Sequence, residues 1–154
     1  MNVKQVVLRQ YQKIVDEAAG KLRSIQIPAE GWVCTVRKAL GMSVPQLSRL
    51  MRISHTAIFR VEKKERSGSV TVKTLQMIAE AMGCRFVYAI IPETTTSKII
   101  ANRALKKAKF LVEQAGNQMV LESQGLSLKQ MQQEIERLCQ ELQLKMPSDL
   151  WEDR

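Results

Sequence analysis

The segment Ser43–Val61 (SVPQLSRLMRISHTAIFRV) constrains the fold of this chain more than any other part of the sequence. Its apolar residues follow the period of two short amphipathic helices that are separated by a tight turn. Ser43 and Ser54 are expected to be the N-caps of these helices, and Gln46 is expected to complete a capping box. The positions expected to face inward are Leu47, Leu50, Ile53, Ile58 and Val61.

Two helices in this arrangement are typical of a helix-turn-helix, in which the second helix enters the major groove of DNA. Since Ile58 and Val61 are expected to face the core, the other side chains at the start of the second helix point outward. Arg60 can contact guanine O6 and N7 together, and Phe59 can pack on a thymine methyl. The candidate base-reading residues are His55, Thr56, Phe59 and Arg60.

Positive charge is concentrated on the same part of the chain. The net charge of the whole chain is +9, and residues 32–66 hold eight Lys and Arg against two Asp and Glu. From residue 97 onward, nine basic residues face eight acidic ones. A cationic excess on one motif suits phosphate neutralisation, although a solvated charged surface is the alternative. The candidate phosphate contacts are Ser43, Gln46, Arg49, Arg52, Lys63, Lys64 and Arg66.

One short segment breaks the helical period. Residues 84–91 (CRFVYAII), followed by Pro92, are rich in β-branched and aromatic residues, which predicts a strand. A lone strand needs hydrogen-bond partners, and the same strand of a second copy would supply them across a dimer axis. The alternative is a strand covered by the chain's own helices. The predicted dimerisation residues are Phe86, Val87, Tyr88 and Ile90.

The sequence therefore predicts a mainly α fold, a helix-turn-helix bundle with one strand and helical extensions at both ends. The apolar stripe of the last helices fits either a core or a partner-binding groove. The terminal Trp151 is expected to dock. The four predicted parts are an N-terminal helical extension (1–31), the helix-turn-helix domain (32–83), the dimerisation strand (84–92) and a C-terminal helical extension (93–154).

Several classes of function are not expected. Three widely spaced cysteines and a single histidine do not suit a zinc site or a disulfide scaffold. There is no Gly-rich phosphate loop and no second histidine for an acid–base pair, so we expect neither enzymatic activity nor a cofactor or metal. No apolar run is long enough for a membrane span, and the N-terminus lacks a signal-peptide core. A cytoplasmic protein is expected.

The stretch from Val36 to Cys84 resembles the Xre/Cro-type helix-turn-helix family. This resemblance implies a dimeric repressor that binds a palindromic operator. The chain departs from the family pattern at Val44, where Gln is usual, and at Arg52, where Gly is usual; Ser48 stands where the family has a small residue. The matching positions are Leu40-Gly41, Ser43, Leu47, Ile53-Ser54, Ile58, Val61-Glu62, Thr74-Leu75, Ala79-Glu80-Ala81 and Gly83.

Over its whole length, including the N-terminal helix, RFVYAIIPE and the helical tail, the chain resembles the "mobile mystery protein A" family. The resemblance implies an antitoxin-like autoregulator whose partner is a Fic-domain protein. The Ser/Thr-x-x-x-Glu-Gly/Asn motif of Fic inhibitors is absent, because Gln26 stands four residues before Glu30-Gly31. Two alternatives remain open: an antitoxin that binds its partner through residues 97–154, and a phage-type regulator without a toxin partner.

Overall fold

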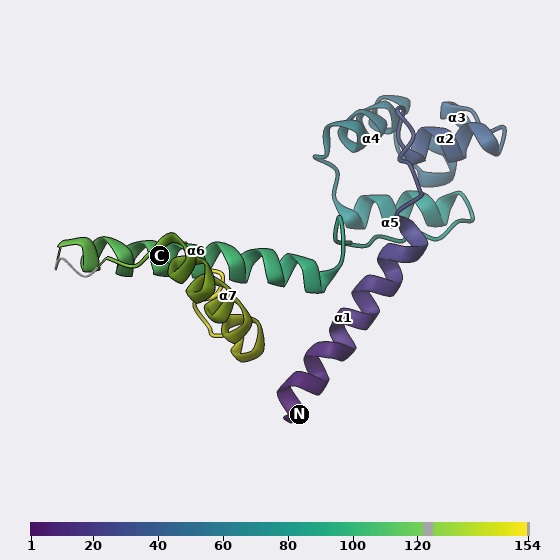
Figure 1. Ribbon diagram of the computed structural model, residues 1–154. Coiled ribbons are helices and arrows are strands. Elements are labelled where there is room, and N and C mark those ends of the chain that lie inside the picture. The colour runs from purple at the N-terminus through teal and green to yellow at the C-terminus, as the bar shows by residue number, and fades with distance from the viewer. Residues whose placement is uncertain (122–124, 154) are drawn as a thin grey trace. The chain divides into compact units, whose positions relative to one another are not determined.

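The computed structural model describes residues 1–121 and 125–153, and over these ranges it contains seven helices and no strand (Figure 1). The chain divides into two units, one of residues 22–90 and one of residues 1–21 with 91–154. None of the helices in the described ranges has the length and apolar character needed to cross a membrane. The helices are α1 (Val3–Leu22), α2 (Trp32–Ala39), α3 (Val44–Met51), α4 (His55–Ser67), α5 (Val72–Ala81), α6 (Thr96–Leu121) and α7 (Leu128–Lys145).

The unit of residues 22–90 consists of α2 to α5 packed around one apolar core. Leu47 of α3 and Ile58 of α4 are completely buried, as predicted, and Val61 packs against the same core. Burying a Leu or Ile side chain contributes roughly 1.5–3 kcal/mol, so these contacts fix α3 against α4. The buried members of the core are Val33, Val44, Leu47, Ile58, Ile78 and Met82.

The prediction that Leu50 and Ile53 face inward was wrong. Leu50 is 57% exposed, because the buried face of α3 instead carries Val44, Leu47 and Ser48. Ile53 is 37% exposed, and the turn is closed by the backbone rather than by an apolar side chain. The amide of Ile53 donates to the Ser48 carbonyl at 3.1 Å.

The predicted strand at residues 84–92 is also wrong, and the described fold is all-α. β-Branched residues favour an extended backbone, but a sheet also needs a neighbouring ladder of donors and acceptors. In residues 1–121 and 125–153 no segment forms such a ladder, and residues 84–92 run as an irregular connector. Tyr88 is 72% exposed and Ile90 is 91% exposed. The ring of Tyr88 stacks on Phe86 with centroids 6.1 Å apart.

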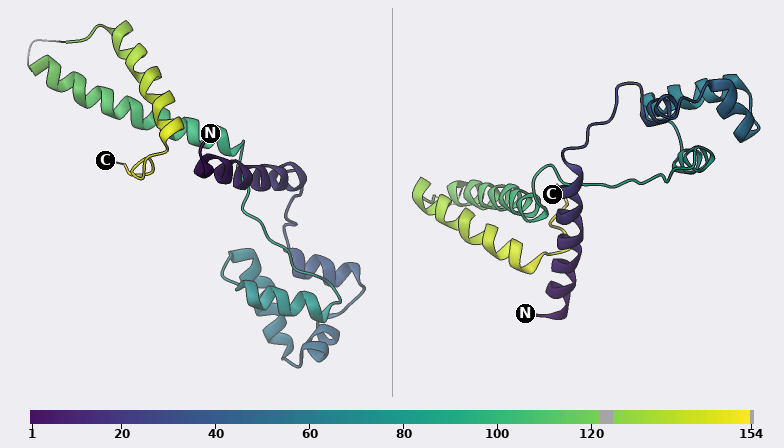
Figure 2. Two further views of the ribbon diagram at one scale, coloured as in Figure 1. Left: turned by 90° about the horizontal axis from the view of Figure 1, so that it is seen from below. Right: turned by 90° about the vertical axis from the view of Figure 1, so that its right-hand side faces the viewer.

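In the other unit, α6 and α7 lie side by side as a helical hairpin (Figure 2). The C-terminal turn docks on α6 through Leu150, which is completely buried, whereas Trp151 is 56% exposed. The aromatic side chain therefore does not dock as predicted. Buried Lys107 of α6 donates to the Asp149 carbonyl at 2.9 Å and so holds this turn in place.

Candidate nucleic-acid interface

The start of each helix in the segment Ser43–Val61 is fixed by a side-chain cap, as predicted. The Ser43 hydroxyl accepts from the Gln46 amide at 3.3 Å, and the Ser43 amide donates to Gln46 Oε1 at 2.7 Å. This capping box satisfies donors that a helix N-terminus leaves free. The Ser54 hydroxyl accepts from the Ala57 amide at 3.1 Å, so α4 begins at His55. The side chains of Ser43 and Gln46 thus serve first to build α3.

The four candidate base-reading residues lie together on the first two turns of α4 and are all exposed. Phe59 is 58% exposed, although it is a large apolar side chain, while its neighbour Ile58 is completely buried. The helical period separates the two sets, because positions 58 and 61 point to the core and positions 56 and 60 point away. A surface that approaches α4 from outside therefore meets these four side chains.

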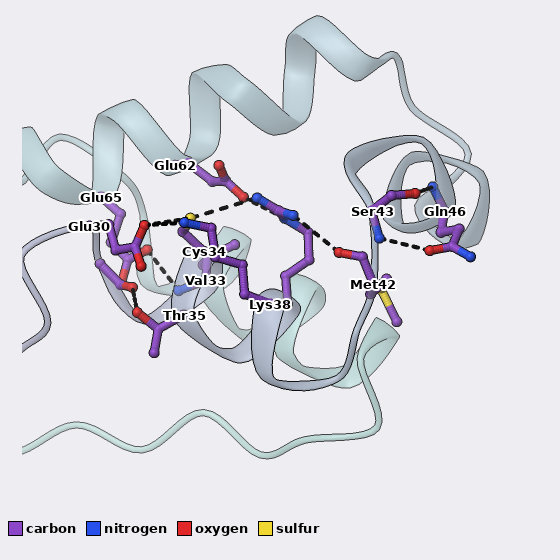
Figure 3. A network of polar contacts seen from close by, with 12 residues as sticks. Glu30, Val33, Cys34, Thr35, Lys38, Met42, Ser43, Gln46, Glu62 and Glu65 are labelled. Atoms are coloured by element: carbon purple, nitrogen blue, oxygen red, sulfur yellow. Dashed lines mark hydrogen bonds and ion pairs between the residues drawn. The ribbon is translucent and has the colours of Figure 1, made fainter.

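Glu62 of α4 points inward and forms a buried ion pair with Arg37 of α2 (Figure 3). Arg37 Nε donates to Glu62 Oε1 at 2.8 Å, and Arg37 Nη1 donates to the Met42 carbonyl at 3.1 Å. The side chains of Arg37 and Glu62 are only 10% and 6% exposed. The hydrogen bond to Glu62 raises the pKa of Arg37 above its ordinary value. The ion pair thus anchors α4 to α2 and to the turn before α3.

Glu65, one turn further along α4, caps the N-terminus of α2 (Figure 3). Its two carboxylate oxygens accept from the amides of Trp32 at 2.6 Å and Val33 at 3.0 Å. A carboxylate at this end of a helix also interacts favourably with the helix dipole. Gly31 is required beside it, because its φ is +84° and a Cβ there would lie 2.8 Å from Glu65 Oε2.

These two contacts divide the charged run at residues 62–66 (EKKER) between two sides of α4. Its acidic members face the fold, so the outer side of α4 carries cations without carboxylates between them. Glu62 and Glu65 follow the buried Ile58 at helical spacings of four and seven residues, and this period was the available sequence signal. Within residues 1–121 and 125–153, no ion pair to a carboxylate involves the exposed cations Arg49, Arg52, Arg60, Lys63, Lys64 and Arg66.

In a comparison with known protein families, a family described as helix-turn-helix matches residues 35–88. These residues form a helix-turn-helix domain. The family model that matches these residues is of the Xre type, whose members are DNA-binding regulatory domains and not typically enzymatic. No curated protein and no solved structure matches the chain significantly. The resemblance to the "mobile mystery protein A" family is not among the matches.

The turn of the helix-turn-helix domain has an unusual residue at its centre. Arg52, the C-cap of α3, lies in the left-handed region with φ 56° and ψ 42°. Glycine adopts this conformation freely, whereas other residues are less stable in it by roughly 1–2 kcal/mol. The chain thus keeps a cation at the turn in spite of a conformational cost. Val44, the other departure from the family pattern, is buried in the core and contributes to packing.

A small open cavity lies between α4 and the start of α5. Its volume is about 180 Å³, and its lining includes Arg60, Lys64, Ser69 and Thr71. Thr71 is the N-cap of α5 and accepts from the Thr74 amide at 3.1 Å. Two cations and several hydroxyls therefore surround one hollow next to the exposed face of α4.

Proposed function

We propose that this protein is a sequence-specific transcriptional repressor that binds a palindromic operator in duplex DNA as a homodimer. The inward orientation of Glu62 and Glu65, which leaves only positive charges on the exposed face of α4, is the main support for this proposal. Phosphate contacts dominate the affinity of such proteins, and a cationic face without internal neutralisation is suited to them.

In this proposal the residues of α4 divide into two roles. Arg60 contacts guanine, Phe59 packs on a thymine methyl, and His55 and Thr56 contact neighbouring base edges or phosphates. The cations around them contact phosphates, and the hollow beside Lys64 and Thr71 accommodates one further phosphate oxygen. The phosphate contacts are assigned to Arg49, Arg52, Lys63, Lys64 and Arg66. Ser43 and Gln46 hold the N-terminus of α3 towards the sugar–phosphate backbone of the DNA.

The two roles are separable by experiment. The preferred duplex is first selected from a random library with the wild-type chain, and its affinity is compared with that of a scrambled duplex. Arg60→Ala should reduce the preference between the two duplexes by roughly 5- to 100-fold, which corresponds to the loss of one bidentate base contact. Lys63→Ala should weaken both duplexes equally and lower the salt dependence by about one unit of slope.

Lys129→Ala is the matched control, because Lys129 is an exposed cation on α7, outside the helix-turn-helix domain. It should change neither the affinity nor the salt slope. An unchanged preference in Arg60→Ala would show that α4 does not read bases in the proposed orientation.

A more specific proposal follows from the resemblance to the "mobile mystery protein A" family. In it, the repressor acts in the cytoplasm as the autoregulating, antitoxin-like member of an operon that also encodes a Fic-domain protein. A reporter fused to the promoter upstream of the chain's own gene should be repressed by wild type and released by Arg60→Ala. Co-expression with the neighbouring gene product, followed by purification of a complex, tests the protein-binding role. A regulator with no such neighbour is the phage-type alternative.

A further inference from the structure

We propose that two copies of this chain associate through α1, with the two α1 helices antiparallel to each other. This inference rests on the proposed homodimer and identifies its interface. The surface involved is a row of apolar side chains on one side of the helix, which we call the α1 stripe. The α1 stripe consists of Val3, Val7, Tyr11 and Ile14.

Within its own unit, the residues that the structure describes leave the α1 stripe largely exposed. Val3 is 79% exposed, Tyr11 is 66% exposed and Ile14 is 64% exposed. Their spacing of three and four residues places them on one face of the helix. The face of α1 that contacts its own unit is a different one, in which Ala19 is buried. An apolar stripe of this length is typical of a helix face that packs against another surface.

The unit that contains α1, α6 and α7 also has too small a core of its own. Its buried apolar side chains, among the residues that the structure describes, are mostly alanines with one valine and one leucine. Such small side chains remove little apolar surface from water, which leaves a unit of this size short of stability. A second copy would add large side chains to this core. The buried set is Ala19, Ala104, Ala108, Val112 and Leu150.

A groove beside the α1 stripe can take side chains from another helix. It has a volume of about 690 Å³ and lies between α1, the start of α6 and the end of α7. Val7 and Tyr11 of the α1 stripe line the groove on the α1 side. Leu144 and Met146, at the end of α7, also line it. The lining contains cations and no Asp or Glu. Its charged side chains are Lys4, Arg9 and Lys145.

The charge distribution along α1 favours an antiparallel over a parallel pair. The first half of the helix carries Lys4 and Arg9 and no acid. The second half is neutral overall, because two lysines balance its two acids, and Glu17 is paired with Lys13 at 3.8 Å. In an antiparallel pair, the neutral half of one α1 lies along the cationic groove of the other. A parallel pair would place Lys4 and Arg9 beside their own copies. The antiparallel arrangement also sets the two helix dipoles in opposition.

The area available is sufficient for a specific dimer. With roughly 150–250 Å² for each large side chain, the exposed fractions leave about 400 Å² on each α1 stripe. Two copies supply about 800 Å², and the groove walls bring the total to about the 1,000 Å² at which specific interfaces begin. A two-fold axis through the middle of α1 would then produce a closed dimer with two DNA-binding domains.

The first test is the mass of the full chain in solution without DNA, measured by sedimentation equilibrium. Wild type should have twice its chain mass of 17.5 kDa. Tyr11→Glu and Ile14→Glu should each raise the dimer dissociation constant by at least about 100-fold, since each buries a charge in an apolar contact. Leu128→Glu is the control, because Leu128 is an apolar residue on α7 that is 87% exposed and lies outside the groove.

The circular dichroism of each variant should match that of wild type, because the altered side chains are exposed in the single chain. Should a glutamate variant lose helical signal, Tyr11→Ala replaces it, with at least about tenfold weaker association expected. A monomeric wild type overturns the proposal. A dimer that all α1 variants leave intact, or that Leu128→Glu weakens equally, also overturns it.

The second test measures direction with a short bis-maleimide cross-linker. Gln10→Cys lies near the middle of α1, so the two copies of Cys should be within reach in an antiparallel pair. Lys21→Cys lies at the end, and its copies should be about 30 Å apart. Cross-linking above the wild-type background is expected for the first variant alone, and efficient cross-linking of Lys21→Cys would refute the antiparallel arrangement.

The outcomes separate this inference from the proposed function. A monomeric chain in which Arg60→Ala still alters base preference would leave sequence-specific DNA binding in place and remove only the α1 interface. A dimer without base preference would leave the α1 interface in place and remove only sequence-specific DNA binding.

Discussion

Replacement of Arg37 by methionine should remove most of the stability of the helix-turn-helix unit. Arg37 and Glu62 are 10% and 6% exposed, so removing one partner leaves the other buried without its counter-charge. Such losses cost about 3–5 kcal/mol. A unit of about 70 residues, such as Leu22–Ile90, has a total stability of roughly 4–10 kcal/mol. We therefore expect a decrease in Tm of at least about 12 °C for this unit.

The matched control is the double variant Arg37→Met/Glu62→Leu, which removes both charges and retains apolar volume. Replacement of a whole buried pair by apolar residues is often neutral, so the double variant should lie within about 1–2 kcal/mol of wild type. The remaining cost is the donor lost by the Met42 carbonyl, which Arg37 Nη1 contacts at 3.1 Å. The double variant should thus be more stable than Arg37→Met.

The assay is urea unfolding followed by tryptophan fluorescence. In a Trp151→Phe background, Trp32 at the start of α2 reports on the helix-turn-helix unit alone. A loss below about 1 kcal/mol in Arg37→Met, or a double variant less stable than both single variants, would refute the reasoning that a buried, coupled ion pair anchors α4.

Three further predictions concern single residues. Arg52→Gly should raise the free energy of unfolding of the helix-turn-helix unit by about 0.5–1 kcal/mol, because glycine adopts the left-handed backbone freely. The same variant should weaken binding to every duplex. Arg52→Ala should weaken binding without raising the urea midpoint. Gly31→Ala should destabilise by about 2 kcal/mol or more in the same assay, whereas Gly41→Ala, also at positive φ but with nothing within 4 Å of its added Cβ, should cost only about 1 kcal/mol. Arg103 and Lys106 lower the pKa of Asp153 from 3.8 to about 2, so its contribution to docking of the C-terminal turn is fully present above pH 3.8 and is lost as the pH falls towards 2. Trp151 fluorescence in a Trp32→Phe background should report this transition, and Asp153→Asn should remove it.

The helices and their caps were predictable from the sequence, because they depend on contacts within a few residues. Ser43 with Gln46 and Ser54 with Ala57 satisfy local donors, so composition and spacing are sufficient to place them. The burial of Ile58 likewise follows from the helical period of α4.

What the sequence did not reveal depends on tertiary contacts. The strand prediction failed because residues 84–92 have the composition of a strand, while a sheet requires a second segment that the described chain does not provide. Leu50 has the same side chain as Leu47, but only the geometry of α3 against α4 and α5 decides which of the two is buried. The ion pair of Glu62 was not predicted, because its partner Arg37 lies 25 residues away in sequence.

The inward acids of α4 have a consequence for altering DNA preference. The positions that hold α4 in place are 58, 61, 62 and 65, and the positions assigned to bases are 55, 56, 59 and 60. The two sets share no residue. A library that varies only the second set therefore leaves every anchoring contact intact, so the domain should fold with many different reading surfaces. The residues of α4 that are proposed to read DNA can therefore be varied independently of the residues that hold α4 in the domain.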